Sequence, residues 1–309
     1  FSLNVPEQRD TWYTTSFLLD QKQTANGLAK HRFNNFKKQP LHYKFPENFT
    51  GILPKIDKTT TKPKAAIIRE KGVNGDREMA YSLFLAGFDV KDIHMTDLIS
   101  GREDLSDVNM IVYVGGFSNS DVLGSAKGWA GAFLYNPKAK QALDNFYARP
   151  DTLSLGVCNG CQLMMELGLV ESKGATQPMH HNASGKFESG YLNVEIPVNN
   201  SIMLNSLAGS KLGIWVAHGE GRFLFEGSEE DYNISMKYSS SHYPANPNNS
   251  EFNTAGICSN DGRHLAMMPH LERIIFPWQA GHYPADKKQD EVTPWFEAFV
   301  NAKKWVEKQ

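Results

Sequence analysis

The chain has 309 residues, of which 40% are apolar and 21% are charged, as expected for a globular protein of one large or two smaller domains. Its 32 basic and 34 acidic residues give a formal charge of −2, which favours neither nucleic acid nor an anionic membrane as a partner. The sequence lacks a secretory signal and any apolar run near the roughly 20 residues that a membrane-spanning helix requires. Since it begins with Phe1, we expect a processed chain or a piece of a longer one.

The first 62 residues are polar and weakly patterned. A short amphipathic helix is predicted to begin near Pro6 and to carry Trp12 and Leu18. Residues 21–62 mix Lys, Asn, Thr and Pro without periodicity, so we expect a linker or an extended arm that lies on another surface.

From residue 63 onward, apolar runs alternate with helical patterns. Strands are predicted over residues 64–70, 88–95, 110–117 and 152–160, and helices over 77–86, 162–167 and 293–308. This alternation predicts a mainly parallel sheet with helices on both faces. After about residue 191 the chain is richer in short strand-like runs and turns.

Three cysteines, Cys158, Cys161 and Cys258, are too few to form a disulfide framework, and their odd number favours a reducing, cytoplasmic compartment. Cys158 and Cys161 form a CxxC pair. A zinc site needs four ligands, and the sequence has neither a second CxxC nor a matching pair of histidines. We therefore predict no metal site and treat the CxxC spacing as incidental.

The strongest chemical signal is the sequence GVCNGCQ, which lies between a predicted strand and a predicted helix. Gly156 and Gly160 flank Cys158 as in a nucleophile elbow, where a Cβ would collide with the neighbouring strand or helix. The helix N-terminus would favour the thiolate. A lone cysteine is more often a buried structural residue, but this context favours a nucleophile.

A cysteine nucleophile needs a base and a group that orients the base. His270 follows a predicted strand, and Glu272 is two residues further on, so both side chains can face the same way. His282 with Asp286 is the nearest rival among ten histidines, and His218 is another. The residue pattern alone favours His270 only modestly.

An oxyanion hole is the third requirement. The turn at Gly116 and Phe117 follows an apolar strand, and its N–H groups, with that of Asn159, are the predicted donors. A glycine-rich turn is common and by itself indicates little. Together with the nucleophile elbow, it favours an oxyanion hole.

Together, GVCNGCQ, GGFS-x-x-DVLG-x-x-x-GWA and MMPH-x-ER resemble the C-terminal glutaminase domain of the large, single-chain phosphoribosylformylglycinamidine synthases. The resemblance covers residues 63–309. It implies a class I glutamine amidotransferase of flavodoxin-like α/β fold, with a mostly parallel central sheet flanked by helices and a smaller antiparallel sheet. It also implies that residues 1–62 are the tail and linker of a preceding synthetase domain.

The resemblance also implies roles for particular residues. Cys158 would be the nucleophile, with His270 and Glu272 completing the triad, which demotes His282. The oxyanion hole would fall on the turn at Gly116 and Phe117 and on Asn159. Candidates for holding glutamine are Gln162, Asn182 and His218.

The implied reaction is hydrolysis of glutamine to glutamate and ammonia through a cysteine thioester. The ammonia would convert formylglycinamide ribonucleotide to formylglycinamidine ribonucleotide in purine biosynthesis. ATP and magnesium would belong to the synthetase domain of the same polypeptide, and no cofactor is expected here, since the sequence has no P-loop. Three alternatives stay open: a catalytically silent regulatory domain, a flavodoxin-like cysteine hydrolase, and a free-standing glutaminase subunit.

The sequence departs from the family pattern at a few positions. Leu271 replaces a usual proline between His and Glu, and Asn119 and Ser120 replace Tyr and Gly. Ser120 matters if its backbone needs positive φ. Asn249 replaces a common glycine and is expected to tolerate left-handed geometry.

Overall fold

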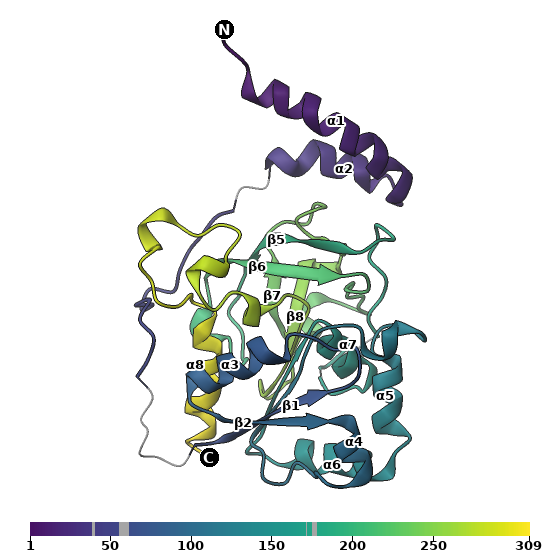
Figure 1. The fold of residues 1–309 in the computed structure, drawn as a ribbon, viewed down its shortest axis with the longest axis vertical. Helices are drawn as coiled ribbons and strands as arrows, with labels where there is room; N and C mark the ends of the chain where they lie inside the picture. The colour runs from purple at the N-terminus through teal and green to yellow at the C-terminus, as the bar shows by residue number, and fades with distance from the viewer. Residues whose placement is uncertain (39–40, 56–61, 171, 175–177) are drawn as a thin grey trace.

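A computed structural model describes residues 1–38, 41–55, 62–170, 172–174 and 178–309 (Figure 1). Within these residues, nine strands form one sheet in the order β2-β1-β3-β4-β9-β8-β7-β5-β6. The strands are β1 Lys64–Arg69, β2 Asp89–His94, β3 Met110–Tyr113, β4 Leu153–Val157, β5 Glu188–Glu195, β6 Lys211–His218, β7 Ile234–Tyr238, β8 Thr254–Cys258 and β9 His264–Met267.

The five strands from β2 to β9 in this order pair in parallel, which confirms the predicted parallel sheet. Strands β3, β4 and β9 are buried along their whole length, as their continuous apolar runs require. Figure 1 shows α3 and α8 on one side of these strands and α4 to α7 on the other. The helices are α3 Asp76–Ala86, α4 Met95–Ser100, α5 Lys127–Leu134, α6 Pro137–Ala148, α7 Asn159–Glu166 and α8 Phe296–Val306.

The predicted smaller antiparallel region exists and is continuous with the parallel region. Strand β9 pairs in parallel with β4 and antiparallel with β8, so it joins the two regions of the sheet. The remaining pairs, through β7 and β5 to β6, are antiparallel. The fold is therefore one mixed sheet, and β9 lies at the junction.

The last helix begins later than predicted. Regular α-helix starts at Phe296. The preceding turn from Thr293 is closed by hydrogen bonds between residues three apart, from Phe296 N to Thr293 O and from Glu297 N to Pro294 O. Such tight turns are common at helix ends.

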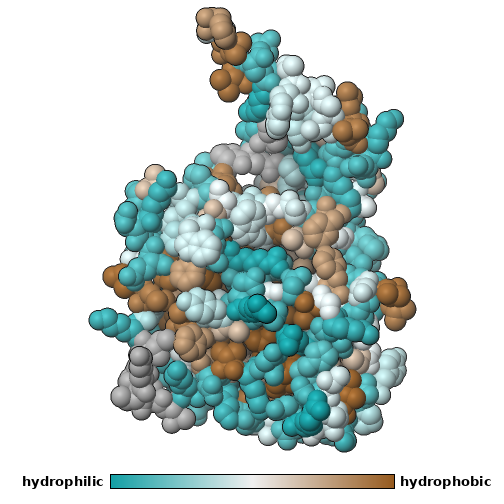
Figure 2. Space-filling model, viewed as in Figure 1, coloured by the Kyte–Doolittle hydropathy of each residue, from teal (hydrophilic) through white to brown (hydrophobic). Residues whose placement is uncertain are grey.

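The first 38 residues form a helical hairpin of α1 (Val5–Gln23) and α2 (Leu28–Asn35), drawn in purple at the top of Figure 1. The helix predicted near Pro6 is confirmed, although it is longer than expected and leaves Trp12 77% exposed. Figure 2 shows apolar side chains uncovered near this end of the chain.

Helix α2 was not predicted, because its contacts rather than its periodicity stabilise it: the Phe33 ring stacks on Tyr13 and Phe17 of α1. The arm after α2 pairs with the edge of the sheet through Lys44 and Lys211. Residues 39–40 and 56–61 of the predicted linker lie outside the described residues. Among the residues that the structure describes, no helix is long and apolar enough to cross a bilayer.

Candidate active site

Cys158 lies on a strained turn between β4 and α7, with φ 53° and ψ −105°. A Cβ on Gly160 would come within 2.0 Å of the Tyr113 carbonyl oxygen on β3, and one on Gly156 within 2.5 Å of the Gly160 carbonyl oxygen. The reason given for both glycines is thus confirmed. A non-glycine residue in this backbone conformation is costly and persists only where its surroundings enforce it.

His270 reaches Cys158 from the neighbouring strand. It follows β9, which is the parallel neighbour of β4, and its N–H donates to the Trp215 carbonyl at 2.9 Å. Both side chains pack on Gly115, where a Cβ would lie 2.7 Å from His270 Cε1 and 3.4 Å from Cys158 Cβ. Two residues that are far apart in the sequence therefore meet across one glycine.

Glu272 contacts the imidazole of His270 at Nδ1 and orients the ring. Its Oε1 lies 2.7 Å from His270 Nδ1, and both side chains are 1% exposed. Burial lowers the pKa of His270, but the charges of Glu272 and Cys158 outweigh burial and raise that pKa to about 9. At neutral pH the ring is thus an imidazolium. A hydrogen bond with the Cys158 side chain also raises this pKa, and Cys158 Sγ lies 3.6 Å from the Ala217 carbonyl oxygen.

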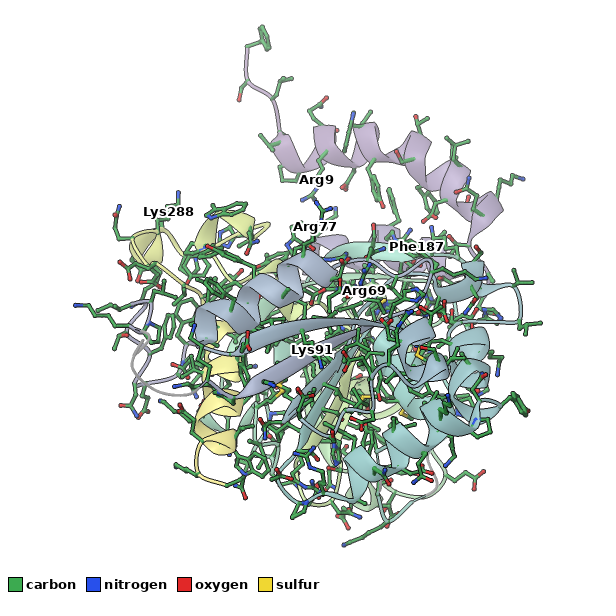
Figure 3. All side chains as sticks on the ribbon, turned by 60° about the horizontal axis from the view of Figure 1, so that its bottom comes forward. Arg9, Arg69, Arg77, Lys91, Phe187 and Lys288 are labelled. Atoms are coloured by element: carbon green, nitrogen blue, oxygen red, sulfur yellow. The ribbon has the colours of Figure 1, made fainter. Side chains whose placement is uncertain are left out.

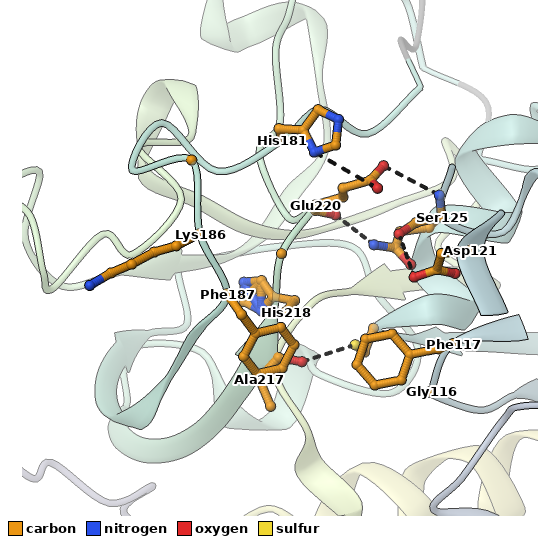
Figure 4. Close-up of a pocket in the computed structure, with 14 residues that line it drawn as sticks. Gly116, Phe117, Asp121, Ser125, His181, Lys186, Phe187, Ala217, His218 and Glu220 are labelled. Carbon is orange, nitrogen blue, oxygen red and sulfur yellow. Dashed lines mark hydrogen bonds and ion pairs between the residues drawn. The ribbon is translucent and has the colours of Figure 1, made fainter. Parts of the chain in front are cut away.

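Cys158 lines a pocket of about 230 Å³ (Figure 4). Of the sequence-predicted residues, Gly116, Phe117, Cys158, Gln162 and His218 line it. The other lining residues are Asp121, Ser125, His181, Gly185, Lys186, Phe187, Ala217, Gly219 and Glu220.

The predicted oxyanion hole is only partly available in this conformation. The N–H of Phe117 donates to the Gly72 carbonyl at 2.9 Å, so it is not free to bind a substrate oxygen. The side chain of Asn159 accepts from the Ser118 N–H at 3.1 Å and fixes the turn to the elbow. Gly116 lines the pocket beside Cys158, and Asn159 directly follows Cys158 in the chain, so their N–H groups stay candidates for the oxyanion hole.

The three residues predicted to hold glutamine have different positions. Gln162 lines the pocket, with its amide donating to the Glu220 carbonyl at 2.6 Å. His218 also lines it, and burial together with the nearby charge of His270 lowers its pKa to about 3, so the ring is neutral.

Asn182, the third candidate, is not among the residues that line the pocket. Its side chain lies outside the pocket lining and cross-links backbone, donating to the carbonyls of Lys186 at 3.0 Å and His218 at 2.7 Å and accepting from the Gly221 N–H at 3.2 Å. A buried amide that satisfies backbone groups in loops has the same appearance in sequence as one that binds a ligand.

Sequence reasoning missed an acidic end of the pocket. Asp121 and Glu220 lie away from the sulfur, and Figure 4 shows them grouped with Ser125 and His181. Glu220 accepts from the Ser125 N–H at 3.3 Å and lies 3.8 Å from His181 Nδ1. Burial and the charge of Glu220 raise the pKa of Asp121. Asp121 belongs to the motif GGFS-x-x-DVLG, but the sequence analysis assigned no role to either carboxylate.

The His282 alternative is excluded by position. His282 is exposed and stacks on Tyr43, in the loop before α8. All three cysteines are free, and the full burial of Cys161 raises the pKa of its thiol well above the usual value. No cluster of three potential metal ligands occurs among the described residues.

The family departures fall where the backbone is unusual. Asn119, Ser120 and Asp121 have φ of 53°, 58° and 51°, so Ser120 does occupy a position that favours glycine. Asn249, at φ 61°, adopts the expected left-handed geometry. Leu271 is fully buried, so it packs in the core.

A mixed α/β sheet that carries a strained thiol next to a buried histidine–carboxylate pair defines a class of amide-processing enzymes, and the comparison with known families agrees. Residues 62–306 match the CobB/CobQ-like glutamine amidotransferase domain, and the chain belongs to this family.

Within the family, the chain matches phosphoribosylformylglycinamidine synthases, as predicted. It is 40% identical to that of Homo sapiens over 98% of this chain and 25% of the human protein. It is 42% identical to that of Schizosaccharomyces pombe over 96% of this chain and 24% of the relative. The chain thus spans about a quarter of the curated relatives that it matches.

Solved structures agree on the fold. A structure described as PurLQS from Thermotoga maritima matches 78% of this chain and 99% of its own, with a TM-score of 0.61 and 26% identity. A putative GMP synthase subunit from Thermoplasma acidophilum matches 81% of this chain and 96% of its own with a TM-score of 0.50, and its 14% identity shows the shared fold alone. The predicted fold class is confirmed.

Proposed function

We propose that this chain is the glutaminase domain of a phosphoribosylformylglycinamidine synthase and that Cys158, His270 and Glu272 carry its chemistry. The observation that carries the proposal is that the elbow sulfur of Cys158 lines a pocket while the buried His270–Glu272 pair packs beside it at Gly115. The His270 imidazolium adjoins the sulfur, so it is placed to donate a proton to the leaving group.

The reaction follows from these positions. The Cys158 thiolate attacks the side-chain amide carbon of glutamine, and the developing oxyanion is stabilised by the N–H groups of Gly116 and Asn159. The His270 imidazolium protonates the amide nitrogen, the C–N bond breaks, and ammonia leaves a γ-glutamyl thioester. The now neutral His270 takes a proton from water, which attacks the thioester and releases glutamate and the thiolate.

The acidic end of the pocket suits the α-ammonium group of glutamine, at the opposite end of the substrate from its side-chain amide. Glutamine carries an α-ammonium group, and Asp121 and Glu220 supply negative charge across the pocket from Cys158. Gln162 and the neutral His218 line the space between and offer polar atoms to the α-carboxylate and the side-chain amide. The pocket therefore selects a zwitterion with an extended amide side chain.

The names of the relatives point to the use of the ammonia. We propose that residues 63–309 form the glutaminase domain, and that residues 1–62 connect it to a synthetase domain of the same cytoplasmic polypeptide. There, formylglycinamide ribonucleotide would be aminated with ATP and magnesium. Because the chain spans about a quarter of such relatives, the synthetase reaction would take place outside it.

The deciding experiment measures glutamate and ammonia release from glutamine by this chain, alone and with the synthetase part added. We expect weak turnover alone, stimulation by the synthetase part, and loss of both in Cys158→Ser. Turnover that survives Cys158→Ser would contradict the proposed mechanism. Equal full activity with and without the synthetase part would show that the site is complete by itself.

A further inference from the structure

The helical hairpin, residues 5–35, is bonded to one wall of the pocket. We call residues 183–188 the pocket wall, since Gly185, Lys186 and Phe187 line the cavity. The loop between α1 and α2 reaches its backbone: the Ala25 N–H donates to the Ser184 carbonyl, and Asn26 Nδ2 donates to the Ala183 carbonyl, both at 2.8 Å.

Four charged side chains strengthen this attachment. Arg32 of α2 lies 2.9 Å from Asp20 of α1 and 2.6 Å from Glu188 of the pocket wall. Asp20 also pairs with Lys186, and Glu188 accepts from the Tyr243 hydroxyl at 2.8 Å. The Asp20 and Glu188 side chains are 12% and 8% exposed, so solvent screens these pairs less than it screens surface pairs.

The inner side of the same wall shapes the pocket mouth. The rings of Phe187 and Phe117 lie 6.0 Å apart between centroids, on opposite sides of the opening, and each is about half exposed. In Figure 3 Phe187 lies just below the hairpin, and Figure 4 shows Lys186 directed away from the cavity. The Lys186 side chain therefore connects the hairpin to the wall while its backbone faces the pocket.

The attachment of the hairpin is mainly polar. Of the side chains in its two helices, Leu28 and Ala29 are the buried ones, and both belong to α2. Apolar contacts join α1 to α2, whereas ion pairs around Asp20 and Arg32 and the hydrogen bonds of Ala25 and Asn26 join the hairpin to the wall.

We propose that the α1–α2 hairpin is a positioning element for glutamine binding, which holds the pocket wall through Asp20 and Arg32 although both lie outside the cavity lining. This inference rests on the proposed glutaminase function. The reacting groups lie on the turns that follow β4 and β9 and not on the wall itself, so displacing the hairpin changes affinity for glutamine more than the rate of its hydrolysis.

The test compares Asp20→Ala and Arg32→Ala with Asp10→Ala in the full chain. Asp10 is the matched control, because it pairs with Lys37, just after α2, and not with the wall. We expect KM for glutamine to rise roughly three- to tenfold in the first two variants. We expect kcat to change little, Asp20→Glu to recover most of the loss, and Asp10→Ala to match the unaltered chain.

Two further measurements separate this inference from the proposed function. Calorimetric titration of L-glutamine into chains that carry Cys158→Ser reports affinity without turnover, and hydrogen exchange of residues 183–188 reports wall mobility without ligand. We expect weaker binding and faster exchange in Asp20→Ala. Equal affinity and equal exchange in Asp20→Ala and Asp10→Ala would overturn the positioning role and leave the glutaminase function intact. Failure of every chain to bind or hydrolyse glutamine would instead overturn the proposed function and, with it, the positioning role.

Discussion

His270 Nδ1 lies 2.7 Å from Glu272 Oε1, and the contact is closed to solvent, since each side chain is 1% exposed. The buried carboxylate of Glu272 favours the charged form of the imidazole and so raises the pKa of His270. The sulfur of Cys158 also raises this pKa. This pair thus sets both the orientation and the charge of the ring that faces the thiol.

The first prediction concerns pH. Because the imidazolium must protonate the leaving ammonia, kcat/KM for glutamine should fall as pH rises through about 9, the raised pKa of His270. Glu272→Gln removes the main partner that raises this pKa, so the alkaline limb of the profile should move to lower pH. If the alkaline limb of the kcat/KM profile is unchanged in Glu272→Gln, a group other than His270 controls that limb.

The same pair affects stability. The pKa of His270 is raised in the folded protein above the usual 6.5, so its charged form adds stability that is fully present below about pH 6.5 and is lost as pH rises towards about 9. The stability difference between the unaltered chain and Glu272→Gln, measured by urea unfolding, should therefore shrink across this interval. A stability difference that grows with pH would contradict the raised pKa of His270.

The third prediction contrasts two histidines. His270→Ala should lower kcat for glutamine hydrolysis by roughly 10²–10⁴-fold, the usual contribution of acid–base catalysis. His282→Ala is the control, because His282 is exposed and stacks on Tyr43 away from the sulfur. Steady-state assays should show near-normal turnover in the control. Similar losses in both variants would again make His282 a candidate for the catalytic base.

The fourth prediction uses the cysteines as internal controls. A glutamine-like chloroketone should alkylate Cys158 and spare Cys161 and Cys258, whose buried thiols have raised pKa values. Peptide mass spectrometry locates the adduct. Absence of any adduct on Cys158 would support the silent regulatory alternative.

The fifth prediction tests the elbow. Gly160→Ala places a methyl group 2.0 Å from the Tyr113 carbonyl oxygen, so β3 and α7 must separate. We expect a loss of about 1–3 kcal/mol or more in the free energy of unfolding. Gly190→Ala is the matched control, since the nearest atom to its Cβ, on Leu192, is 4.0 Å away. Chemical denaturation of the two variants gives the comparison.

The elbow could be predicted from the sequence because its constraint is local: Gly156 and Gly160 are dictated by clashes within one turn. His270 needed the family resemblance, since many histidines compete and only the placement of β9 next to β4 brings this one to the sulfur. Helix α2 and the acidic pair of Asp121 and Glu220 were missed because each depends on contacts between distant segments. The backbone cross-links made by Asn182 could not be predicted, because such contacts leave no distinct pattern in sequence.

The position of β9 has a consequence for how the protein is made. This strand is inserted between β4 and β8 and comes late in the chain, so a nascent polypeptide that ends before it already contains the thiol and still lacks the imidazole. A polypeptide that ends before β9 therefore cannot assemble the cysteine and histidine side by side, whatever the state of its other strands.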